Sequence, residues 1–91
     1  MHWPIGAKWE ELKFLADELE RYSRALWFRA YISFRVIVNA SVFYNNEGAT
    51  YEFVLIKRSG NSTEVLGRYT NIDTAVGVVK LLVGTIKEEL Q

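Results

Sequence analysis

The stretch RAYISFRVIVNASVFY, residues 29–44, decides the fold of this chain. Every even-numbered position from 30 to 44 is apolar, while the odd-numbered positions mix charged, polar and apolar side chains. A period of two is typical of a β-strand that buries one face. We therefore predict a strand over residues 30–44. Because an average strand has only about 5–6 residues, this one should contain a bulge or a strong bend.

The sequence after this stretch contains the patterns of two further strands. Segments rich in Asn, Ser and Gly at residues 45–48 and 59–62 are typical of turns. Polar and apolar residues alternate again over residues 50–58 and 63–69, which predicts a second strand and a shorter third one. Gly67 weakens the third strand and indicates either a bulge or a close approach of other atoms.

Apolar residues at steps of three and four predict a helix at each end of the chain. The first helix should run from residue 7 to about 24, with acidic side chains in its first turn and basic ones in its last, as the helix dipole favours. The segment RALWFR that follows could extend this helix or lead into the strand. The last helix should occupy residues 70–90, capped either by Asn71 or by a capping box of Thr70 and Asp73.

These elements predict one α+β domain spanning residues 1–91. The order is α-β-β-β-α, and the three strands form an antiparallel meander. Each helix has one apolar stripe, so both helices should pack on one face of the sheet.

Charge and composition narrow the classes of function. Eleven basic and eleven acidic residues give a net charge of zero, although residues 21–70 carry seven basic and three acidic residues, a balance of +4. A dedicated nucleic-acid domain is usually far more basic, and a net charge near zero favours association. The chain has no cysteine, no signal-peptide pattern and no apolar run long enough to span a membrane, so we expect a cytoplasmic protein.

No pattern of residues predicts catalysis. His2 is the only histidine, cysteine is absent, and no metalloprotease, nucleophile-elbow, P-loop or dinucleotide-binding motif occurs. The acidic residues of the first helix have no histidine or cysteine companions and fit a solvated helix face. We therefore expect no enzyme activity, catalytic residue, metal site, cofactor or small-molecule substrate.

The second face of the sheet carries the strongest functional signal. If the even positions of the first strand face the helices, together with Val65 and Tyr69 of the third, the opposite face is too apolar and too rich in arginine for an ordinary solvated face. Such patches usually mark interfaces, where aromatic residues and arginine are enriched. The side chains expected there are Arg29, Tyr31, Arg35, Ile37, Phe43, Glu52, Val54, Ile56, Arg58, Leu66 and Arg68.

We therefore predict a non-catalytic accessory or adaptor subunit that binds another protein, which is either a different chain or a second copy in a homodimer. The residues predicted to bind the partner on the sheet are Arg29, Tyr31, Arg35, Ile37, Val54, Ile56 and Arg68. A second candidate surface lies on the last helix, at Gly77, Val78, Leu81 and Gly84. Glycine weakens a helix. We therefore expect one of two explanations for these two glycines: another backbone approaches them closely, or the loss of stability is tolerated.

Two alternatives stay open for the sheet face. Its arginines and Tyr31 could bind RNA or DNA, with the tyrosine stacking on a base. Alternatively, its side chains could complete a second small core beneath residues 1–5 or beneath the corner at Trp27 and Phe28.

Two families resemble this chain in pattern. The α-β-β-β-α order resembles the double-stranded-RNA-binding domain, whose last helix begins with lysines that contact phosphates. Here that helix begins NIDTAVGVVK, with Asp73 early and Lys80 as its first basic residue, which argues against that mode of binding. The apolar last helix is also similar to that of the dimerisation subunit of the complex that makes threonylcarbamoyladenosine on tRNA. That resemblance implies helix packing against a second copy, but the strand over residues 63–69 departs from that family.

Overall fold

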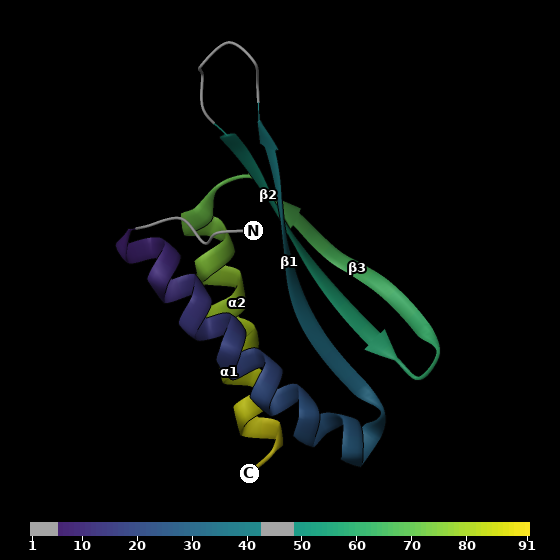
Figure 1. Ribbon diagram of the computed structural model, residues 1–91. Helices are drawn as coiled ribbons and strands as arrows, with labels where there is room; N and C mark the ends of the chain where they lie inside the picture. Colours follow the sequence, from purple (N-terminus) through teal and green to yellow (C-terminus); the bar gives the residue numbers. More distant parts are fainter. Residues whose placement is uncertain (1–5, 43–48) are drawn as a thin grey trace.

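The computed structural model describes residues 6–42 and 49–91 and confirms the predicted order of elements (Figure 1). The three strands form one antiparallel sheet in the order β1-β2-β3. The predicted turn at residues 45–48 and the predicted surface residue Phe43 lie outside the described residues. The elements are α1 (Ala7–Ala30), β1 (Ile32–Val42), β2 (Ala49–Ser59), β3 (Ser62–Tyr69) and α2 (Ile72–Glu89).

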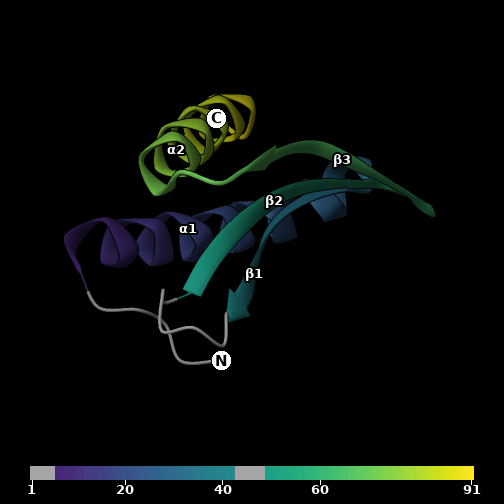
Figure 2. The same ribbon diagram turned by 90° about the horizontal axis from the view of Figure 1, so that it is seen from above.

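Both helices pack on the same face of the sheet (Figure 2). The apolar stripes of the two helices meet each other and the apolar row of the central strand, as the periodicities predicted. The even-numbered residues Phe34, Val36 and Val38 of β1 pack against this core. Its buried members are Leu12, Leu15 and Leu19 from α1, Phe53 and Leu55 from β2, and Ala75, Val76, Val79, Val83 and Ile86 from α2.

Helix α1 is longer than predicted, and β1 starts later. The helix continues through RALWFR to Ala30, because Arg24, Ala25 and Leu26 favour a helix and because Leu26 and Trp27 continue its half-buried face. Tyr31 then ends the helix in the left-handed conformation (φ 57°), with its N–H donating to the carbonyl oxygen of Trp27. Arg29 and Tyr31 are therefore not strand residues, which corrects the predicted start of the strand.

The register of the sheet is interrupted between β2 and β3 and not between β1 and β2. Strand β1 pairs with β2 in unbroken register from Ile32 to Val42, so no bulge interrupts it. The register shifts instead between β2 and β3: Leu55 lies opposite Gly67 and Ile56 opposite Val65, which leaves Leu66 without a partner. Of the alternatives predicted for Gly67, the bulge is confirmed. Of the bulge or strong bend predicted for the first strand, the bulge is absent and β1 instead curves along its length (Figure 1).

The remaining boundaries follow local chemistry. The tight turn between β2 and β3 contains Gly60 in the left-handed region (φ 57°), which glycine adopts readily. Asn71 is the cap of α2, because its side-chain oxygen accepts the N–H groups of Asp73 (2.8 Å) and Thr74 (3.2 Å). No helix within the described part of the chain is long and apolar enough to cross a membrane.

Helix α1 crosses the sheet obliquely, which determines what it covers. Near its N-terminus the Trp9 ring lies 4.7 Å from Tyr51 and 5.4 Å from Phe53, measured between ring centres, so it packs on the central strand. Near its C-terminus the hydroxyl of Ser23 hydrogen-bonds to the backbone of Phe34 at the outer edge of β1. From the corner at Tyr31 the helix and β1 then diverge (Figure 1).

Candidate interaction surface

The face of the sheet that the helices leave uncovered, called the open face here, is organised in rows across the three strands. Antiparallel partners present their side chains on the same face. The register therefore places Ile37, Val54 and Arg68 in one row. The next row holds Arg35, Ile56 and Val65, and the row beyond it holds Ser33, Arg58 and Thr63. Four apolar side chains thus lie together between arginines.

Accessibility differs strongly across the open face. Val54 is only 5% exposed although it is not part of the core under the helices. It lies on the central strand, where the neighbours in its row are Ile37 and the long side chain of Arg68. Ile37 and Ile56 are half-buried, and Arg35 is exposed. Of the predicted binding residues, Val54 is therefore too buried to contact a partner and instead packs against its neighbours in the row. Arg35, Ile37 and Ile56 are accessible for contact.

An ion pair crosses one end of the open face. The guanidinium of Arg68 donates to a carboxylate oxygen of Glu52 at 2.7 Å, and both side chains are substantially exposed. Exposed pairs of this kind contribute at most about 1 kcal/mol to stability. The pair neutralises Arg68 locally, so Arg35 and Arg58 in the neighbouring rows carry the positive charge of this face.

The bulge changes which residue of β3 lies on the open face. Strict alternation predicted Val65 on the helix side and Leu66 on the open face. The register instead places Val65 opposite Ile56, where it is 46% exposed, and Leu66 is the unpaired residue of the bulge. Gly67 is the sequence feature that could have indicated this change, because glycine in a strand often marks a bulge. The extra residue of a bulge moves the side chains beyond it to the opposite face of the sheet.

Arg29 and Tyr31 lie at a corner rather than on the open face. Arg29 donates to the backbone carbonyl oxygen of Glu89 at 3.4 Å, which joins the end of α1 to the end of α2. Tyr31 accepts the N–H of Gly60 (2.8 Å) on its carbonyl oxygen, and its ring, 66% exposed, packs edge-on against Trp27. The guanidinium of Arg58 lies 4.8 Å from the centre of the Trp27 ring.

Phe28, next to this corner, does not cover the sheet. Its side chain is 89% exposed, so the second small core that the sequence allowed under the corner does not include it. The other segment considered for that core, residues 1–5, lies outside the described residues.

The second candidate surface lies on the outer side of α2. Leu81 is 75% exposed there, while Val78 is half-buried and packs against the core. A methyl group added at Gly77 or Gly84 would meet no atom within 4 Å. No backbone of the described chain therefore approaches these glycines, so contacts within this fold do not require either of them.

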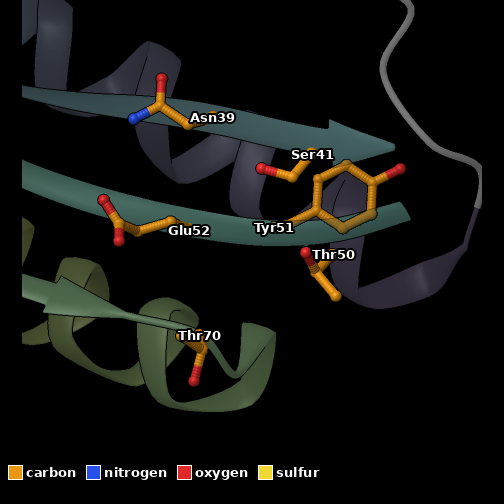
Figure 3. Close-up of a pocket in the computed structure, with 6 residues that line it drawn as sticks. All are labelled: Asn39, Ser41, Thr50, Tyr51, Glu52 and Thr70. Carbon is orange, nitrogen blue, oxygen red and sulfur yellow. The ribbon is translucent and has the colours of Figure 1, made fainter. Parts of the chain in front are cut away.

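A cavity of about 590 Å³ is lined by residues of β1 and β2 with polar side chains and by Thr70 (Figure 3). The only carboxylate in its lining is Glu52, which is paired with Arg68, so the lining offers no acid–base pair. Within residues 6–42 and 49–91, no three potential ligands from His, Cys, Asp and Glu are close enough to hold a metal ion. The cavity lining is Asn39, Ser41, Thr50, Tyr51, Glu52 and Thr70.

Compared with known proteins, the chain matches no family model, no curated relative and no solved structure.

Proposed function

We propose that this domain is a non-catalytic interaction module that binds another protein on the open face of its sheet. The observation that carries the proposal is the cluster of Ile37, Ile56 and Val65 on a face that no described helix or strand covers. A sheet face in contact with water alone normally carries polar residues at these positions. Burying this cluster against a partner removes apolar area from water, which is the main driving force for association.

The charges around the cluster suit a protein partner. Arg35 and Arg58 flank the apolar residues, and arginine is enriched at protein interfaces because its planar head forms several hydrogen bonds. A partner surface with apolar side chains and a few carboxylates would match this arrangement. The partner is a different chain or a second copy, since the net charge of zero opposes neither.

The test is the substitution Ile56→Glu, with Leu81→Glu as the matched control on α2. Ile56→Glu places a charge in the centre of the cluster and should abolish partner capture from cells, or self-association measured by light scattering. It should leave the circular dichroism spectrum unchanged. Leu81→Glu adds the same charge to an exposed leucine elsewhere and should leave binding intact. Loss of folding with Ile56→Glu would show that the face is core. Loss of binding with Leu81→Glu alone would move the interface to α2.

A second candidate function is binding of single-stranded RNA or DNA at the corner. The observation that favours it is the exposed ring of Tyr31 beside the Arg58–Trp27 contact, because bases stack on aromatic rings and on guanidinium planes. Such binding weakens steeply with salt, since phosphate contacts release counterions. Titration of a fluorescent oligonucleotide at low and high salt distinguishes this function from an apolar protein interface, whose affinity depends weakly on salt.

A further inference from the structure

The outer side of α1 carries a large apolar side chain that the fold does not use. Phe14 is 63% exposed and is not part of the core. Successive residues of a helix are rotated by about 100°, so Leu12 and Leu19, which are buried, lie on the opposite side of α1 from Phe14. Phe14 therefore lies on the side of α1 that faces away from the sheet and from α2.

Carboxylates surround Phe14. The residues three and four positions before and after it, which are its neighbours on a helix surface, are all acidic: Glu10, Glu11, Asp17 and Glu18. Glu11 is paired with Lys8 at 3.6 Å, whereas the other three form no ion pair with any described residue. Residues 10–18 hold four acidic residues and one basic residue, a balance of −3. We call Phe14 and the unpaired Glu10, Asp17 and Glu18 the α1 patch.

The open face of the sheet has the complementary composition. Its accessible apolar residues are Ile37, Ile56 and Val65, and Arg35 lies in one row with the last two. The side chain of Arg35 is exposed and forms no ion pair or hydrogen bond with any described residue. The charged residues of the open face are three arginines and one glutamate, a balance of +2: Arg35, Arg58, Arg68 and Glu52. Each surface thus has an apolar centre, and the unpaired charges around the two centres are opposite in sign.

We propose that the α1 patch of one copy of this chain docks on the open face of a second copy, with Phe14 against the cluster of Ile37, Ile56 and Val65. The carboxylates of the patch then lie beside the arginines of the open face. Both helices lie on the other side of the sheet from the open face, so one chain cannot make this contact within itself (Figure 2). The inference rests on the proposed function and names its partner, a second copy.

Two properties of the chain favour this pair of surfaces over like-with-like contacts. Two open faces in contact would bring arginines together, and two α1 patches would bring carboxylates together, and like charges across an interface oppose binding. A helix is also the usual cover for a sheet face, as the opposite face of this sheet shows. The net charge of zero leaves no general repulsion between copies.

The proposed contact joins two different surfaces, which determines how the assembly grows. Each copy that uses its open face still has a free α1 patch, and each copy that uses its patch still has a free open face. Contacts of this kind form closed rings or open filaments rather than two-fold dimers. The mass of the wild type should therefore rise with concentration beyond that of two chains.

The test uses two variants that each lose one surface. Phe14→Lys removes the ring and adds a positive charge to the α1 patch, and Ile56→Glu places a negative charge in the apolar cluster. By light scattering, each variant alone should have the mass of one chain where the wild type exceeds two. An equimolar mixture should have the mass of two chains, because only one functional patch and one functional open face remain. Leu81→Lys, at an exposed leucine of α2, is the matched control and should associate like the wild type.

NMR locates the contact in the same mixture. In a ¹⁵N-labelled Phe14→Lys chain, the amide signals of Ile37, Ile56 and Val65 should shift when the unlabelled Ile56→Glu chain is added. The amide signals around position 14 of the labelled chain should not shift. If Ile56→Glu does not fold, Arg35→Glu, at an exposed position, takes its place in both experiments with the same expected results.

Either of two results would overturn the inference. The first is a wild type with the mass of one chain at every concentration, and the second is a mixture of the two variants that stays at one chain although the wild type associates. Capture of a different protein that Ile56→Glu abolishes and Phe14→Lys does not would then leave the proposed function standing. Partner capture that neither variant affects would contradict the proposed function as well.

Discussion

The hydroxyl end of the Tyr69 ring occupies the space beside Gly67 where the β-carbon of any other residue would lie. A methyl group at position 67 would overlap the hydroxyl and ring carbons of this tyrosine, although its backbone could be adopted by any residue. Tyr69 is half-buried and packs against the core. Its ring fits in this position because the residue at position 67 has no side chain. The glycine is therefore explained by a neighbouring side chain rather than by an unusual backbone angle.

Gly67→Ala should lower the free energy of unfolding by about 1–3 kcal/mol, the usual effect of inserting a methyl group into a packed site. The measurement is urea denaturation followed by fluorescence. The same substitution in a Tyr69→Ala background should be neutral or slightly stabilising, because the overlap is gone and alanine restricts the unfolded chain. An equal loss in both backgrounds would contradict the role given to Tyr69.

Ser23→Ala should destabilise the protein by about 1–3 kcal/mol. The substitution removes the hydroxyl that bonds to both backbone groups of Phe34 and leaves them without a partner. Ser62→Ala, at an exposed site, is the control and should change stability by no more than about 0.5 kcal/mol. Thermal denaturation of the wild type and the two variants measures the difference. Equal midpoints for all three proteins would show that the hydrogen bonds between Ser23 and Phe34 contribute nothing to stability.

Asn71→Ala should lower stability by about 0.5–2 kcal/mol, because the first turn of α2 loses the side chain that accepts two of its N–H groups. Asn71→Asp keeps the acceptor and should preserve stability. Amide exchange at Asp73 and Thr74 provides a local readout, and it should accelerate only in the alanine variant.

Replacing Gly77 and Gly84 with alanine should stabilise the domain by roughly 1 kcal/mol for each site, because alanine favours a helix and both sites face open space. Thermal denaturation tests the gain. Partner binding measured on the same double variant tests the second candidate surface: unchanged binding is expected if the partner uses the open face. A stabilised chain that no longer binds would show that a partner backbone docks against α2.

The overall fold was predictable because its determinants are local periodicities. The switch from helical spacing to strict alternation after residue 29 predicted the order of the elements, and the apolar face of each element predicted the core. The end of α1 was not predictable, because RALWFR suits a helix and a strand alike. Only the packing of Leu26 and Trp27 and the left-handed turn at Tyr31 decide it.

The surface was predictable only in part, for a geometrical reason. Ile37, Val54 and Ile56 lie where alternation placed them, since no irregularity separates them. Val65 and Leu66 do not, because the bulge shifts the register by one residue, and such a shift moves side chains to the opposite face. The burial of Val54 and the bonds of Ser23 depend on neighbouring strands and helices, which a single sequence does not reveal.

The most direct test of the central claim is site-specific photo-crosslinking in living cells. A photoreactive amino acid at position 56 would lie in the apolar cluster of the open face, and the same group at Thr74, exposed on α2, serves as the control. We predict a discrete crosslinked protein adduct from position 56 and none from position 74. An adduct from position 74 alone, or none from position 56 in a folded chain, would contradict the account.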